Sequence, residues 1–162
     1  MKRYLVIGLV SATLLAGCAS LNVDETKNWS AERFYSAAKE KMDDGDYESA
    51  IKYLEKLEGR FPYGRYAEQA QLEAAYAYYK SDEPALALAG AERFIRLHPT
   101  HPSVDYAYYL KGLVNFHGEQ NFINWLFGAK EDLAERDPKG TRDAYFAFKE
   151  LVERFPNSRY AE

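Results

Sequence analysis

Several residue types and motifs that define disulfide-bonded proteins and enzymes are missing from the sequence. The chain has one cysteine, which excludes an internal disulfide. It has no glycine-rich phosphate loop, no nucleophile elbow and no His-x-x-x-His pair. Combined with a repeat fold, which the sequence also predicts and which presents surfaces and not deep pockets, these absences predict a protein that is not an enzyme and that binds no cofactor or metal ion.

An excess of basic residues is missing as well. The chain has 21 Lys and Arg against 25 Asp and Glu, and removing Lys2 and Arg3 with an export signal would take the formal charge from −4 to −6. A surface that binds phosphates is expected to be basic, so we do not expect nucleic acid as a partner. The 47% apolar content nevertheless predicts a folded chain, and 162 residues fit one domain.

A long apolar run occurs only at the N-terminus. Lys2 and Arg3 precede an apolar run from Tyr4 to Ala16, which is the layout of an export signal. These 13 residues rise about 20 Å as a helix, less than the roughly 30 Å hydrocarbon core of a bilayer. The run therefore does not predict a membrane-spanning helix.

The chain's cysteine ends this run in the sequence Leu-Ala-Gly-Cys, which resembles the lipobox of bacterial lipoproteins. The resemblance implies that residues 1–17 are removed and that Cys18 carries the lipid, which would serve as a membrane anchor. A buried cysteine behind a cleaved secretory signal is the alternative. In lipoproteins of this kind an Asp after the cysteine signals inner-membrane retention. Ala19 and Ser20 follow here, so we expect the outer membrane.

The rest of the chain predicts a tether followed by helices. Residues 18–30 show no helical periodicity and are interpreted as the lipidated N-terminus and a flexible tether. From residue 31 onward, apolar residues recur at helical spacing between Gly and Pro interruptions. The predicted fold class is all-α.

Self-similarity shows that these helices form repeats. The eight residues that begin at Phe61 and the eight that begin at Phe155 share six identities. A middle copy lies 37 residues after the first, so that Ala50, Ala87 and Ala144 correspond. A small residue, larger apolar residues four and seven positions later and a proline beyond them resemble the tetratricopeptide repeat, in which antiparallel helix pairs stack into a solenoid.

The repeat alignment divides the helical region into units. We place the repeats at residues 31–62, 63–99 and 100–156, with the start of a fourth at 157–162. Turns are expected at residues 43–46 and 81–84. The third unit is longer than the others and predicts an insertion at about residues 117–138. Because no polar capping element follows, we expect a chain truncated after about three repeats.

Several longer motifs carry a more specific resemblance. They are Ser-Ala-Glu-Arg-Phe-Tyr-Ser-Ala-Ala-Lys at 30–39, Gly-Asp-Tyr-Glu-Ser-Ala-Ile-Lys at 45–52, the segment from Glu58 to Leu72, and His-Pro-Thr-His-Pro at 98–102. With the lipobox, they resemble the BamD/ComL family of outer-membrane lipoproteins over essentially the whole chain. The block at residues 61–72 is its most specific part.

The resemblance implies a function that composition does not indicate. It implies a lipid-anchored scaffold on the periplasmic face of the outer membrane, within the machinery that assembles β-barrel proteins. The implied partners are a BamA-type barrel subunit, other assembly lipoproteins and unfolded outer-membrane β-barrel proteins. Family members have five repeats, the first of which are associated with recognising the C-terminal signal of barrel proteins.

The repeat resemblance also implies where a peptide binds, because the first helix of each pair lines the concave face. Aromatic side chains and an occasional cation suit an extended peptide that ends in an aromatic residue and a carboxylate. Packing between helices is the alternative for each residue. The predicted groove residues are Tyr35, Lys39, Leu72, Tyr76, Tyr79, Tyr109 and Phe116.

Other candidate features have simpler interpretations. Residues 122–127 are rich in large apolar groups, so Phe122, Trp125 and Phe127 either fold back on the third unit or dock a partner. His98 and His101 are expected to pack a loop and not to bind metal. The arginines that flank the repeat junctions are expected to pair with surface acids.

Two other functions remain open at this stage. A structural envelope lipoprotein that binds peptidoglycan is possible, because aromatic grooves also stack on sugars. A competence-related DNA-uptake factor is the third hypothesis, since the name ComL comes from competence, but the negative charge disfavours it.

Overall fold

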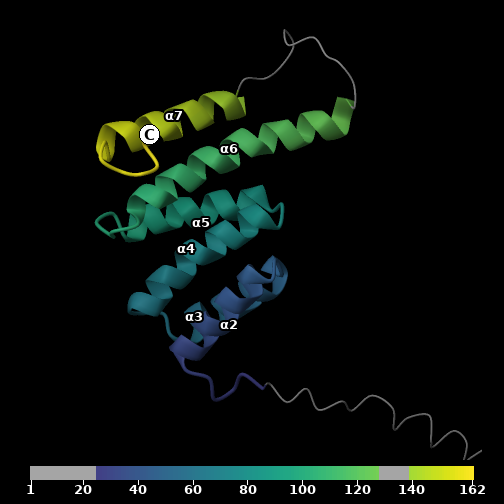
Figure 1. The fold of residues 1–162 in the computed structure, drawn as a ribbon, viewed down its shortest axis with the longest axis vertical. Helices are drawn as coiled ribbons and strands as arrows, with labels where there is room; N and C mark the ends of the chain where they lie inside the picture. The colour runs from purple at the N-terminus through teal and green to yellow at the C-terminus, as the bar shows by residue number, and fades with distance from the viewer. Residues whose placement is uncertain (1–24, 128–138) are drawn as a thin grey trace, which may run out of the picture.

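The computed structural model describes residues 25–127 and 139–162, with side chains up to residue 116 in the first range and throughout the second (Figure 1). Helices and turns, with no strand, make up these two ranges, which confirms the all-α class. The helices are α2 (Ala31–Asp43), α3 (Tyr47–Arg60), α4 (Arg65–Lys80), α5 (Pro84–Leu97), α6 (Val104–Phe127) and α7 (Lys139–Arg154).

Local sequence signals set the helix ends. The Ser30 side chain accepts a hydrogen bond from the backbone N–H of Arg33, and Asp46 does the same for Ser49, so each caps a helix N-terminus. Pro84 occupies the first turn of α5, where a missing N–H costs nothing. Gly64, the N-cap residue that precedes α4, has a φ of 92°, a conformation that favours glycine.

The helices form two layers. Each helix packs against its neighbours in the chain, and α4 also contacts α2 and α6, whereas the backbones of α3 and α5, and those of α5 and α7, do not approach each other closely in the described residues. Helices α2, α4 and α6 therefore make the tighter inner layer, and α3, α5 and α7 the outer layer, in a stack that rises from α2 to α7 (Figure 1).

Small residues let the two layers approach each other. Ala50, Ala87 and Ala144 are each no more than 2% exposed, at equivalent places in α3, α5 and α7. Gly112 of α6 lies so close to the ring of Phe148 that a Cβ at this position would overlap it. These positions explain why Ala and Gly recur in the repeat pattern, since each helix pair must cross closely to bury its apolar face.

Two sequence-based boundaries differ from the structure. Residues 25–30 pack on the first helix pair and are not a flexible tether, because the Trp29 ring lies 5.2 Å from Phe34 and 5.5 Å from Tyr53, and Thr26 is 6% exposed. Helix α6 continues to Phe127, so the first half of the predicted insertion extends this helix. Cys18 and residues 128–138 lie outside the described residues. Within the described ranges, none of the helices has the length and apolar character needed to cross a bilayer.

Candidate binding groove

The inner layer carries two adjoining cavities, which together we call the inner groove. The first has a volume of about 560 Å³ and the second of about 350 Å³. The first is lined by Glu32, Tyr35, Ser36, Lys39, Arg65, Tyr66, Gln69 and His101. The second is lined by Lys39, Met42, Gln69, Leu72, Glu73, Tyr76, Ser103, Tyr106, Arg159 and Tyr160. Lys39 and Gln69 line both cavities, so the two cavities adjoin and together extend from α2 to the segment that follows α7.

A carboxylate between α2 and α4 organises the centre of the groove. Glu73, whose side chain is 14% exposed, accepts hydrogen bonds from the Tyr35 hydroxyl at 3.2 Å and from Gln69 Nε2 at 3.3 Å. Its Oε2 also lies 3.2 Å from Nζ of Lys39. The ammonium of Lys39 is thus neutralised from within the protein, and its main effect is to hold the two helices together.

Burial and Glu73 also change the acidity of Tyr35. Partial burial, followed by the charge and hydrogen bond of Glu73, raises the pKa of Tyr35 to about 12. The Tyr35 ring lies 5.6 Å from the ring of Tyr66, which comes from the start of α4. The first cavity therefore presents the neutral ring of Tyr35 at physiological pH, next to the ring of Tyr66.

Tyr160, which lines the second cavity, contacts two tyrosines of α6, of which Tyr106 lines the cavity as well and Tyr109 packs behind it. The rings of Tyr109 and Tyr160 stack at 5.0 Å and 19°, and Tyr106 lies 5.3 Å from Tyr160. Burial raises the pKa of Tyr106 well above its usual value. Ser158 donates a hydrogen bond of 2.7 Å to Asp105, so the segment after α7 is held onto α6.

The structure gathers some of the predicted groove residues and separates others. Tyr35, Lys39, Leu72 and Tyr76 line the two cavities, although Leu72 is 2% exposed and belongs to the core beneath them. Three predicted residues, Tyr79, Tyr109 and Phe116, do not line either cavity. Tyr79 and Tyr109 serve the packing between helices instead. The side chains of Phe122, Trp125 and Phe127 lie outside the described part of the chain.

Several residues that line the groove were not predicted from the sequence. Tyr66, Tyr106 and Tyr160 add rings, and Glu73 adds the buried carboxylate. The signal for two of them was present, because the Arg-Tyr-Ala-Glu sequence occurs after both Phe61 and Phe155. Glu73 carried no such signal, since only the packing of α2 on α4 makes it a partner of Tyr35.

The histidines contact the protein around them, as expected for loop packing. His98 Nε2 lies 3.2 Å from Gln71 Oε1, and the ring of His101 lies edge-on to that of Phe94 at 5.2 Å. His101 Nδ1 accepts a hydrogen bond from the backbone N–H of Ser103. Neither histidine belongs to a cluster of three or more metal-binding side chains within the described ranges.

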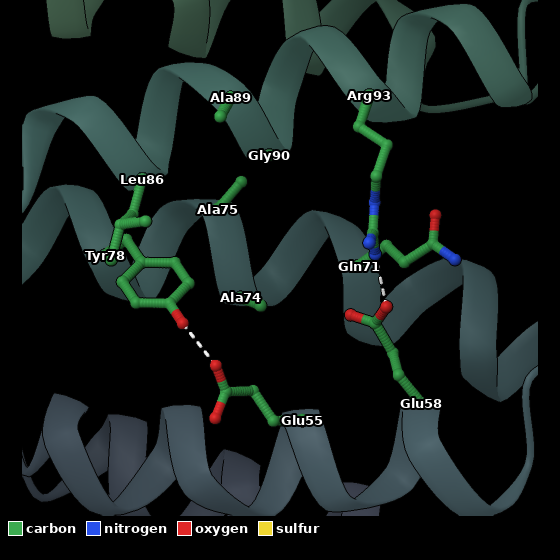
Figure 2. Close-up of a pocket in the computed structure, with 10 residues that line it drawn as sticks. All are labelled: Glu55, Glu58, Gln71, Ala74, Ala75, Tyr78, Leu86, Ala89, Gly90 and Arg93. Atoms are coloured by element: carbon green, nitrogen blue, oxygen red, sulfur yellow. Dashed lines mark hydrogen bonds and ion pairs between the residues drawn. The ribbon is translucent and has the colours of Figure 1, made fainter.

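A third cavity lies on the opposite side of α4, and we call it the outer trough (Figure 2). It has a volume of about 400 Å³ and lies between α3, α4 and α5. Ala74, Ala75 and Gly90 leave the space empty. Arg93 forms an ion pair with Glu58 across the gap between α5 and α3, as Figure 2 shows. The outer trough therefore has a single tyrosine ring, that of Tyr78, among methyl groups and charged side chains, whereas several tyrosine rings line the inner groove.

The comparisons with known proteins agree with this architecture. A family model described as tetratricopeptide repeat matches residues 22–162. A protein of Neisseria gonorrhoeae, "Outer membrane protein assembly factor BamD", is 50% identical over 99% of this chain and 61% of its own length. A protein of the same name from Vibrio cholerae is 42% identical over 100% of this chain and 66% of its own length. A protein of this name from Xylella fastidiosa (strain 9a5c) is 38% identical over 98% of this chain and 54% of its own length. The chain thus spans about three fifths of the first relative.

Proposed function

The chain belongs to the tetratricopeptide-repeat family and is homologous over nearly its whole length to BamD assembly factors, and we propose that it is a lipid-anchored scaffold of β-barrel assembly. In this role it acts at the periplasmic face of the outer membrane, without catalysing a reaction. It binds unfolded outer-membrane proteins and partner subunits, including a BamA-type barrel subunit and other assembly lipoproteins. The names of its relatives support this assignment.

The inner groove, with its two adjoining cavities, is the observation that supports peptide binding. Tyrosine rings from α2, α4 and α6 line it, and rigid rings offer contact area at a low cost in conformational entropy. An extended segment of a barrel protein alternates apolar and polar side chains, so it can place every second side chain against these rings. The residues proposed to contact it are Tyr35, Tyr66, Tyr76 and Tyr106.

The lipid anchor is a separate part of the proposal. Cys18 is the proposed acylation site, and the segment between it and the packed residues from Glu25 connects the anchor to the scaffold. Mass spectrometry of the protein purified from membranes tests this. We expect a mature chain that begins at an acylated Cys18, and a Cys18→Ala variant that is not acylated.

Site-specific crosslinking tests the groove. A photo-crosslinking residue at Tyr76 or Tyr66 should capture a synthetic peptide that copies the C-terminus of a barrel protein. The same residue at Leu86, which is 48% exposed in the outer trough, is the matched control and should capture little. Capture of muropeptide and not of peptide at Tyr76 would favour an envelope tether that binds peptidoglycan.

Depletion in the cell tests the assembly role. If the proposal is correct, barrel proteins should disappear from the outer membrane and accumulate unfolded in the periplasm when this lipoprotein is removed. Re-expression of the wild-type protein should restore them. Normal levels of folded barrel proteins after depletion would rule out an essential role in their assembly.

A further inference from the structure

Charge is distributed unevenly between the inner groove and the rest of the molecule. Three basic side chains and two carboxylates line the groove, so its formal charge is +1 in a chain whose formal charge is −4. These residues are Lys39, Arg65, Arg159, Glu32 and Glu73. The groove is therefore a local positive region of an acidic protein, and such a region attracts acidic ligands.

The positive charge that forms no ion pair within the groove lies on two arginines, and Glu32 in the same cavity attracts one of them, Arg65, over a longer distance. Lys39 is paired with Glu73 inside the groove. Neither Arg65 nor Arg159 has a carboxylate within ion-pairing distance in the ranges that the structure describes, although acidic residues outnumber basic ones in the chain. This differs from the surface pairing expected for the arginines at the repeat junctions. Arg154 does pair as expected, with Glu150 at 3.0 Å.

The two arginines are held in the same way. Arg65 lies over the ring of Tyr66 at 4.8 Å and donates a hydrogen bond of 3.0 Å to its hydroxyl. Arg159 lies over the ring of Tyr160 at 4.7 Å and donates to that hydroxyl as well. Each tyrosine in turn contacts a ring of a neighbouring inner helix, Tyr35 or Tyr109. A guanidinium fixed in this way loses less side-chain freedom when it binds a carboxylate.

We propose that Arg65 and Arg159 are two carboxylate anchors, so that the inner groove selects extended peptides with an acidic group at each end of an aromatic stretch. This inference rests on the proposed function, because it requires a peptide in the groove. Guanidinium groups bind carboxylates through two parallel hydrogen bonds, and the rings between the anchors bind the apolar side chains. The carboxylate at one end can belong to a side chain or to the peptide's C-terminus.

The packing of the helices limits the distance between the two acidic groups. Arg65 begins α4, and Arg159 follows α7 in the segment packed on α6. Adjacent helices pack at about 8–10 Å, so we expect the two guanidiniums to be separated by roughly 10–20 Å. An extended peptide covers this distance in about three to six residues, at about 3.3 Å per residue.

Binding of defined peptides to the purified protein and its variants tests the proposal. The probe is a fluorescent peptide of alternating tyrosine and serine with a glutamate four residues before a free C-terminus. Three companion peptides have glutamine at that position, an amidated C-terminus, or both. Arg65→Gln and Arg159→Gln should each weaken binding of the diacid peptide, which has both the glutamate and the free C-terminus, about three- to tenfold. They should leave the affinity for the neutral peptide, which has neither, unchanged. Lysine at either position should restore part of the affinity.

Arg154→Gln is the matched control, because Arg154 also lies over a tyrosine ring, that of Tyr108, but lines neither groove cavity. It should leave all affinities unchanged, and circular dichroism should show the same helix content for every variant. The anchor proposal is wrong if the diacid peptide binds both groove variants as tightly as the wild-type protein. It is also wrong if the variants lose affinity for the neutral peptide to the same extent as for the diacid peptide. If no peptide binds the wild-type protein at all, peptide binding itself is wrong. The companion peptides show whether a side-chain or a terminal carboxylate is bound.

Discussion

Helix α4 contributes to both the inner groove and the outer trough, and the two hollows are lined by different kinds of residue. The inner groove contains tyrosine rings that come from several helices and a carboxylate that is 14% exposed. The outer trough contains Ala74, Ala75, Gly90 and one tyrosine, Tyr78, with an ion pair whose carboxylate, that of Glu58, is 21% exposed. The volume of the outer trough, about 400 Å³, lies between those of the two groove cavities, about 350 and 560 Å³, so the volume of a single cavity does not distinguish a binding surface from a gap left by small residues. The number of tyrosine rings makes that distinction.

The largest expected effect comes from the core that links the two hollows. Phe94 is fully buried against Leu72 and Ala107, and its ring contacts His101 of the inner groove. Phe94→Ala should lower the free energy of unfolding by about 3–5 kcal/mol, because it removes apolar contacts and leaves a cavity. Urea denaturation measures this. Leu97→Ala, at a position 59% exposed in the same helix, is the control and should change stability by less than about 1 kcal/mol. Equal losses would show that Phe94 is not central to the core.

Removing one carboxylate from each hollow tests the contrast directly. Glu73→Gln in the inner groove should cost about 1–2 kcal/mol of stability, because Tyr35 and Lys39 lose a charged hydrogen-bond acceptor that is largely buried. Glu58→Gln in the outer trough should cost about 0.2–1 kcal/mol, since its partner Arg93 is 48% exposed. Thermal unfolding of both variants at low and high salt provides the measurement. A larger loss for Glu58→Gln would reverse the comparison.

Alkaline titration compares one tyrosine of each hollow. Partial burial followed by neighbouring glutamates, Glu73 for Tyr35 and Glu55 for Tyr78, raises the pKa of each tyrosine to about 12. The pKa of both in the unfolded chain is near 10, so the folded state binds more protons between these values. Their contribution to stability should be complete below about pH 10 and be lost as the pH rises to about 12.

Absorbance of tyrosinate follows these titrations. Glu73→Gln should lower the pKa of Tyr35 and leave that of Tyr78 unchanged, whereas Glu55→Gln should do the reverse. Tyr35→Phe should remove one high-pH step from the titration. If a single substitution moved both steps, the two hollows would be electrostatically coupled and not separate.

The smallest expected effects come from two glycines of the outer layer. A Cβ at Gly90 would lie 3.0 Å from the Cβ of Ala75, which is fixed to the backbone of α4, whereas a Cβ at Gly59 meets nothing within 4 Å. Gly59→Ala should therefore stabilise the protein by up to about 1 kcal/mol through helix propensity. Gly90→Ala should gain less or lose about 0.5 kcal/mol, because crowding offsets that gain. Chemical denaturation under identical conditions measures the difference.

Most of the fold could be predicted because the positions that recur in each repeat are those that pack between its helices. The recurrence of Ala50, Ala87 and Ala144 indicated one face of each outer helix, and all three are buried. Part of the groove could be predicted too, since Tyr35, Lys39 and Tyr76 follow from the expectation that the first helix of each pair faces inward. Tyr79 and Tyr109 show the limit, because a tyrosine on a helix can serve packing as well as binding.

The sequence by itself determined the helical class, the repeat pattern and the close helix crossings, because these depend on local periodicity and on residues too small to keep helices apart. Only the tertiary structure decided which charges are paired. Glu73 of α4 lies 34 residues from Lys39 of α2 in the sequence and pairs with it where the two helices pack together. Arg65 and Arg159 instead stack on the tyrosines next to them in the sequence. Ion pairing depends on distances of a few ångströms between side chains, and those distances are set by how separate helices pack.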